Sequence, residues 1–166
     1  MIAQNIAFGL IALAMAVGAV RVVTTKNVVH AALWLVLVLA GVAGNYILLA
    51  AEFVAVVQVI VYIGAIVVLF LFGIMLTRAP IGHDAELDNN QRWVALVVGL
   101  GLFGVLASVL AKAFGRTHVD AAGATTVGTT GLVADSIFTR YVVPFEVVSI
   151  VLLAALVGAV VIARRD

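Results

Sequence analysis

The chain of 166 residues contains no cysteine. It therefore cannot form a disulfide, hold an iron–sulfur cluster through thiolates or build a thiolate metal site. Charge is also scarce, because Lys, Arg, Asp and Glu together make up only 10% of the residues. Their formal net charge of +1 indicates neither a nucleic acid nor an acidic partner.

So few charged residues cannot cover the surface of a soluble domain. Hydrophobic residues make up 66% of the chain, and the mean hydropathy is +1.31. A helix needs about 20 apolar residues to cross the hydrocarbon core of a bilayer. A length that would otherwise suggest one soluble domain therefore provides a handful of membrane-spanning helices.

Five apolar runs have the length of a membrane span, and each is apolar on every face. Strands of a membrane barrel would instead alternate apolar and polar residues. The sequence therefore predicts an all-α integral membrane protein with five transmembrane helices and no internal repeat. The predicted spans cover residues 2–20, 28–49, 53–76, 93–114 and 144–163 of a single membrane domain, 1–166.

Two longer segments between the runs are predicted to be loops. Residues 77–92 form the most polar part of the chain, and residues 115–143 are rich in Gly, Thr and Ala without helical periodicity. No basic residue precedes the first run, so it is interpreted as a retained helix rather than a cleaved signal peptide.

The basic residues predict the orientation of the spans. Six of the nine lie on the side of the first and third loops and the C-terminus: Arg21, Lys26, Arg78, Arg92, Arg164 and Arg165. The other three, Lys112, Arg116 and Arg140, belong to the fourth loop. Because Lys and Arg accumulate on the cytoplasmic side, the N-terminus is expected outside and the C-terminus in the cytoplasm.

Few polar side chains interrupt the spans. Gln58 and Tyr62 lie in the third run, four residues apart, and an α-helix would place them on one face. A polar residue facing hydrocarbon costs free energy, so each needs a partner or a function. Two interpretations stay open for both, a hydrogen bond between helices or a place on a proton route.

Two acidic residues lie at the edges of spans. Glu52 begins the third run, and Glu146 follows Pro144 by two positions at the start of the fifth. Either acid could stabilise the N-terminal end of its helix, where unpaired N–H groups and the positive end of the dipole lie. The alternative is a carboxylate that contacts a neighbouring subunit.

No catalytic motif is present in the sequence. It contains no Ser-His-Asp arrangement, phosphate-binding loop or nucleotide fingerprint. His30 and His83 are too isolated to form a metal site. These observations indicate a chain that carries out no bond chemistry by itself.

Three segments share a pattern with one protein family. The third span contains Tyr62-Ile63-Gly64-Ala65 and continues as Ile66-Val67-Val68-Leu69-Phe70-Leu71-Phe72, followed by Met75-Leu76. The fifth begins Pro144-Phe145-Glu146, followed by Ser149 and Leu152-Leu153, and residues 27–33 lead into the second span. In these segments the chain resembles the J subunit (chain 6) of proton-pumping NADH:quinone oxidoreductase, respiratory complex I.

The resemblance implies a π-bulge in the third helix, here near residues 61–66. Such bulges concentrate at functional sites, and Gly64 lowers the steric cost of an irregular turn. Conversion of this turn between α and π would swing Tyr62 or Phe70 and so gate water. The expected hinge is Tyr62, Gly64 and Ala65, with Gln58 along the adjacent polar route. Some family members carry a carboxylate at the position of Gln58.

The resemblance also implies a non-catalytic subunit of a larger enzyme in the bacterial inner (cell) membrane. This chain would bind no cofactor, whereas NADH, FMN, Fe–S clusters and quinone would lie elsewhere in the complex. Its expected partners are the quinone-proximal, small three-helix and antiporter-like subunits, together with the lipid bilayer and no nucleic acid.

Other interpretations stay open. The chain could be the homologous subunit of a hydrogenase, of an F420- or ferredoxin-linked dehydrogenase or of an Mrp-type antiporter. A free-standing transporter or channel is a different class, and the missing repeat and the lack of charges converging in mid-membrane argue against it. A scaffold that only fills space between subunits is a third possibility.

Overall fold

The computed structural model describes residues 2–77, 91–115 and 129–164, and every regular element in these ranges is helical. Five stretches are long and apolar enough to span a membrane, as the sequence predicted. The elements are α1 (Ile2–Thr24), α2 (Val28–Leu48), α3 (Glu52–Val57), the π-helix η1 (Gln58–Val67), α4 (Val68–Leu76), α5 (Arg92–Phe114), α6 (Thr130–Thr139) and α7 (Val142–Ala163).

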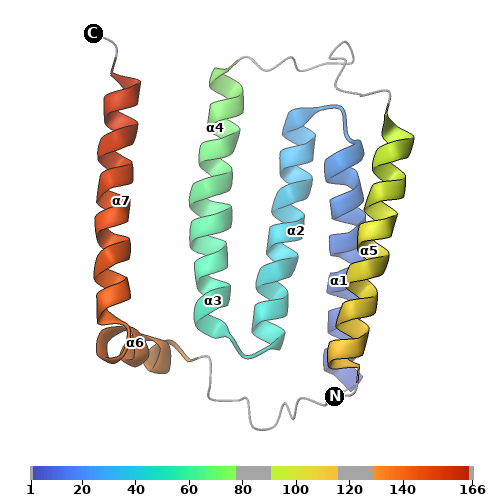
Figure 1. Cartoon of the computed structure of the whole chain (residues 1–166), viewed down its shortest axis with the longest axis horizontal. Helices are drawn as coiled ribbons and strands as arrows, with labels where there is room; N and C mark the ends of the chain where they lie inside the picture. Colours follow the sequence, from blue (N-terminus) through green and yellow to red (C-terminus); the bar gives the residue numbers. More distant parts are fainter. Residues whose placement is uncertain (1, 78–90, 116–128, 165–166) are drawn as a thin grey trace.

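The spans run alternately up and down, so the two termini lie at opposite ends of the helical layer (Figure 1). The elements α3, η1 and α4 form one continuous span, Glu52–Leu76. The short helix α6 lies across the direction of the spans, at the end where α1 begins (Figure 1). Helix α2 packs against α1 on one side and against the third span on the other.

Helix α1 continues three residues beyond Arg21 and ends at Thr24. The arginine therefore lies in the last turn, where a cation is favourable. The Thr24 and Thr25 hydroxyls donate back to the carbonyls of Val20 and Arg21, at 2.8 and 2.6 Å. Asn27 then begins α2, since its Oδ1 accepts the N–H of Val29 at 2.9 Å. A two-helix hairpin therefore forms with a very short turn.

Glycines bring α1 and α2 together. A Cβ added to Gly18 would lie 2.9 Å from Val38 Cγ2, and one on Gly44 would lie 3.1 Å from Ile11 Cδ1. A Cβ on Gly41 would overlap Met15 Cγ outright. Close approach through small residues is the usual way in which membrane helices pack without a hydrophobic driving force.

The turn between α2 and α3 contains the one non-glycine residue with positive φ among those described, Ala50 at 56°. Its N–H donates to the Ile47 carbonyl at 3.0 Å, and the Ala51 N–H donates to the Tyr46 carbonyl at 2.9 Å. These two bonds form a Schellman motif, which normally uses glycine at this position. No glycine in the sequence predicts this turn, but the backbone adopts it at Ala50.

The loop predicted over residues 115–143 is partly wrong, because α6 occupies Thr130–Thr139 and α7 begins at Val142. With ten residues, α6 is too short to cross a bilayer, so the length of its apolar run does not identify it as a span. Pro144 is consequently the third residue of α7 rather than the first. Proline is tolerated there because the first-turn N–H groups have no partner within the helix.

Candidate functional site

The third span contains the irregular feature that the sequence led us to expect. The π-helix η1 covers Gln58–Val67, between α-helical segments on either side. It includes the predicted bulge at residues 61–66 and is longer than a single turn. Long π-helical stretches are rare in proteins and occur frequently at functional sites.

The π-helix determines which residues of the third span face α2. The buried residues of this span are Ala55, Gln58, Val67 and Ile74, all at most 9% exposed. Gln58 and Val67 are nine residues apart, which is two and a half turns of an α-helix at about 3.6 residues per turn. A continuous α-helix would therefore point them in opposite directions.

In a π-helix, with about 4.4 residues per turn, the same nine residues make two turns. Gln58 and Val67 then lie on one face, and both pack into the layer formed with α2. The π-helix therefore keeps the beginning and the end of the third span in contact with the same neighbour. Its loss would turn α4 by about half a turn relative to α3.

Gln58 is the one buried polar residue of the described part of the chain, with 6% of its surface exposed. Its side-chain amide makes no hydrogen bond to any other described residue. Asn45 Oδ1 is the one fully buried side-chain polar atom of the described residues that has no partner, so the Gln58 amide atoms keep some accessible surface. The amide is available to a group outside the chain, such as water or a neighbouring subunit.

A second amide, that of Asn45 on α2, is also incompletely satisfied. Its Nδ2 donates to the Met15 sulfur at 3.3 Å, whereas its buried Oδ1 has no donor. The only hint of this in the sequence is a polar residue inside an apolar run. Two amides of neighbouring elements, α2 and η1, thus carry unused hydrogen-bonding capacity.

The other residues predicted for the gate lie on the outer side of the span. Tyr62 is 47% exposed and Phe70 is 49% exposed, and Gly64 and Ala65 are exposed too. The predicted common face of Gln58 and Tyr62 assumed α-helical spacing. Four residues make about nine-tenths of a π-turn, so Tyr62 lies within about 40° of Gln58 around the helix. Its side chain is nevertheless exposed, whereas Gln58 is buried.

Gly64 has more room than the sequence argument supposed. A Cβ there would meet only the Val59 carbonyl oxygen, at 3.4 Å, which is an ordinary contact. Its φ is not positive, since no described glycine has a positive φ. The π conformation itself thus does not require glycine, and any special role of Gly64 must lie in a change of conformation.

The two candidate acids are exposed and lie on separate elements. Glu52 is in the first turn of α3, as its capping interpretation requires. Glu146 lies beyond the first turn of α7, because that helix begins two residues earlier than predicted, so helix capping no longer accounts for it. Nearby, the Phe138 and Phe145 rings meet edge to face at 5.3 Å and join α6 to α7.

Within residues 2–77, 91–115 and 129–164, no group of three or more His, Asp or Glu residues could hold a metal ion.

The two remaining spans, α5 and α7, present apolar side chains on their surfaces. Helix α5 makes no close contact with another helix of the described part, and neither α5 nor α7 has a buried residue among those described. Lipid or other chains must cover this surface.

Comparison with known proteins agrees with the pattern in the third and fifth spans. The family model described as NADH-ubiquinone/plastoquinone oxidoreductase chain 6 matches residues 18–162. F(420)H(2) dehydrogenase subunit J of Methanosarcina mazei is 44% identical over 170 residues, covering 98% of this chain and 92% of that protein.

Photosynthetic organisms supply further relatives. The chloroplastic NAD(P)H-quinone oxidoreductase subunit 6 of Mesostigma viride is 35% identical over 166 residues, covering 98% of this chain and 85% of that protein. NAD(P)H-quinone oxidoreductase chain 6 of Leptolyngbya boryana is 36% identical over 167 residues, with 98% and 81% covered. The chain therefore belongs to the NADH-ubiquinone/plastoquinone oxidoreductase chain 6 family.

Proposed function

We propose that this chain is a non-catalytic membrane-arm subunit of a proton-translocating quinone oxidoreductase, and that η1 helps couple quinone reduction to proton movement. The observation that carries the proposal is a long π-helix in the third span, within the segment that matches the family. The polar side chain of its first residue, Gln58, is largely buried and makes no hydrogen bond within the described chain, which supports a place beside a polar route.

The relatives differ in the electron donor that their names give, either NAD(P)H or F(420)H(2). A shared membrane subunit fits both if other chains select the donor and hold NADH, FMN, Fe–S clusters and quinone. We assign this chain to an NADH-linked enzyme, with the F420-linked one as the alternative. Its partners would be the quinone-proximal, small three-helix and antiporter-like subunits.

The proposed location is the bacterial inner membrane, with the N-terminus outside and the C-terminus in the cytoplasm. Arg21, Lys26 and Arg164 lie at the end of the helical layer opposite the N-terminus (Figure 1). Lys112 and Arg140 lie at the other end, near the end of α5 and between α6 and α7. The excess of basic residues at the first end supports its placement in the cytoplasm.

The coupling step would be conversion of η1 between π and α. Starting from Gln58, an α-helix at about 3.6 residues per turn would bring Tyr62, Ala65 and Leu69 onto the face of Gln58. Val67 and Ile74 would leave that face. Because a π-helix turns each residue about 18° less than an α-helix, the conversion would move Tyr62 by about 70° around the helix, from one side of Gln58 to the other.

The proposed gate acts through this movement of Tyr62 relative to Gln58. Two adjacent polar groups can hold water in an otherwise apolar layer, because a buried water needs two to four polar partners. With the Tyr62 side chain exposed, as it is in the π form, Gln58 alone offers too few. Water, and with it a proton path, would then depend on where the conversion of η1 places Tyr62.

Substitution of Gly64 by leucine or valine tests the gate. A bulky side chain beside the Val59 carbonyl would bias the turn toward one form, so proton pumping should be uncoupled or turnover blocked. Oxidation of the electron donor by the peripheral arm should stay intact. Gly73→Leu is the matched control, because Gly73 lies on the same span in α4 and a Cβ added there would have no atom within 4 Å.

Normal coupled pumping in Gly64→Leu and Gly64→Val would contradict the hinge and leave the scaffold interpretation. The assignment to a complex has its own test, which is the set of polypeptides retained after mild detergent extraction. Antiporter-like subunits and a flavoprotein arm are expected. Isolation as a lone homo-oligomer with solute flux in liposomes would instead favour a free-standing transporter.

A further inference from the structure

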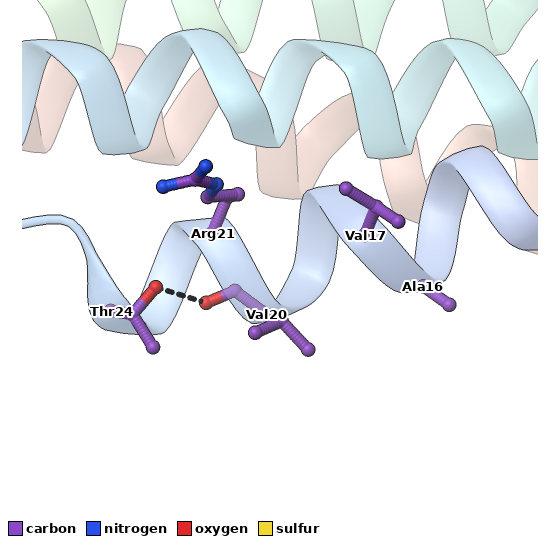
Figure 2. Close-up of a pocket in the computed structure, with 5 residues that line it drawn as sticks. All are labelled: Ala16, Val17, Val20, Arg21 and Thr24. Carbon is purple, nitrogen blue, oxygen red and sulfur yellow. Dashed lines mark hydrogen bonds between the residues drawn. The ribbon is translucent and has the colours of Figure 1, made fainter.

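A pocket of about 480 Å³ lies along the second half of α1, away from the third span (Figure 2). Its lining residues form a stripe that ends at the last turn of the helix: Ala16, Val17, Val20, Arg21 and Thr24. The pocket is a shallow, largely open groove, and nearly all of its lining is apolar. Among the described residues, Arg21 is the one charged side chain that lines it.

Arg21 has no acidic partner in the part of the chain that the structure describes. Its side chain points toward α2 (Figure 2), and its guanidinium lies 5.9 Å from the centre of the Trp34 ring of that helix. The guanidinium stays charged at any physiological pH and offers five donors in a planar fork. Contact with the face of Trp34 leaves the edge of that fork available for an anion.

Among the lining residues, Arg21 is also the available donor. The Thr24 hydroxyl already donates to the Val20 carbonyl at 2.8 Å (Figure 2). Ala16, Val17 and Val20 present only aliphatic carbon, and the two valines are 49% and 59% exposed. One strong cation therefore lies at the end of an open apolar stripe.

We propose that this pocket binds one anionic phospholipid, with the phosphate on Arg21 and an acyl chain along Val17 and Ala16. The order of groups along the span supports a lipid. The cation lies in the last turn of α1, at the membrane edge, and the apolar stripe runs from it toward the membrane interior. A phospholipid presents its charge and its hydrocarbon in the same order.

Two neighbouring residues fit this occupant. Lys26 follows α1 on the same side and adds a second cation near the headgroup. Trp34 is an amphipathic ring of the kind that lies at the headgroup level of membranes. The site is independent of the coupling proposed for η1, because the third span contributes no lining residue.

The test uses the whole complex extracted in mild detergent, stripped of lipid and supplied with phosphatidylglycerol or with phosphatidylcholine. Retained phospholipid is counted by mass spectrometry. Arg21→Gln should bind phosphatidylglycerol about fivefold more weakly, the factor expected for one Arg at an anionic surface. Arg21→Lys should lose less, because it keeps the charge, and retained phosphatidylcholine should not change.

Lys112→Gln is the matched control, since Lys112 is an exposed cation in the last turn of another span. Val17→Trp provides a second variant, which fills the apolar stripe and leaves Arg21 in place. It should displace the same lipid. Wild-type retention in both Arg21→Gln and Val17→Trp would overturn the proposal. Loss of a co-purifying subunit from Arg21→Gln with its phosphatidylglycerol unchanged would do so too, and would assign Arg21 to a protein carboxylate.

Discussion

The hairpin of α1 and α2 and the span formed by α3, η1 and α4 use the bilayer in contrasting ways. In the hairpin, glycines bring two regular α-helices into close contact, and both ends of α2 are held by hydrogen bonds. The third span packs on the same α2, yet its middle is π-helical and includes the buried polar residue Gln58. The hairpin is built to hold one geometry.

In the proposed coupling step, the third span takes up a second geometry. Close-packed interfaces switch between discrete arrangements rather than deforming continuously. Here the regular hairpin offers the fixed surface, and the π-helix selects which residues of the third span meet it. Four substitutions test this contrast, and their expected effects on stability decrease from Gly41→Ala in the hairpin to Gly64→Ala in the π-helix.

The largest effect is expected from Gly41→Ala. The added Cβ would overlap Met15 Cγ, which is not the free end of a side chain, so α1 and α2 must move apart. Overpacking of this kind typically costs about 1–3 kcal/mol. The thermal midpoint for loss of the chain from the purified complex should fall, while Gly9→Ala on α1, with nothing within 4 Å, should leave it unchanged. An unchanged midpoint in Gly41→Ala would show that the hairpin is not close-packed.

The second substitution, Gln58→Leu, separates stability from coupling. Replacing this amide, which makes no hydrogen bond within the described chain, with an apolar side chain of similar size should leave the free energy of unfolding unchanged or raise it by about 1 kcal/mol. Proton pumping per electron should fall, because the polar member of the route is lost. Gln58→Glu is the paired variant, and a buried carboxylate should lower stability. Lower stability in Gln58→Leu would instead reveal a polar partner in a neighbouring subunit.

Ala50→Gly tests the turn at which the two regions meet. A left-handed conformation costs a residue with a Cβ about 1 kcal/mol, and glycine avoids that cost. The substitution should therefore raise the thermal midpoint slightly. Ala51→Gly, at a negative φ of −95°, should lower it instead. Equal effects at the two positions would contradict the observed turn.

How much of this could be predicted from sequence differs between the two regions. The apolar runs specified the five spans, because in the hydrocarbon core such a stretch satisfies all of its backbone hydrogen bonds only as a helix. Composition and periodicity did not specify η1, which came from the resemblance of residues 62–76, since α and π turns bury the same residue types. The helix α6 was missed because ten residues give too weak a periodic signal.

The sequence also did not predict which side chains of each helix face a neighbouring helix. Gln58 and Tyr62 were expected on one face, but the structure buries Gln58 and leaves the Tyr62 side chain exposed. Capping of α7 by Glu146 does not account for that residue, because the helix begins at Val142 rather than at the proline. The second difference arises from helix phase, where a shift of one or two residues turns a side chain to another face. Composition carries no information on phase.

The smallest effect is expected from Gly64→Ala, which is also the sharpest comparison with Gly41→Ala. In the π form the new Cβ would lie 3.4 Å from the Val59 carbonyl oxygen, an ordinary contact, so no steric penalty arises. Alanine also favours a helix over glycine by about 1 kcal/mol, in the π and the α form alike. The free energy of unfolding should therefore stay at the wild-type value or rise by up to about 1 kcal/mol. If the gate depends only on which form η1 adopts, pumping should also stay near wild type, in contrast to Gly64→Leu. A large loss of pumping in Gly64→Ala at unchanged stability would mean that the coupling step needs a backbone conformation that only glycine adopts. Because alanine adopts both the π and the α form, that result would contradict a switch between these two forms.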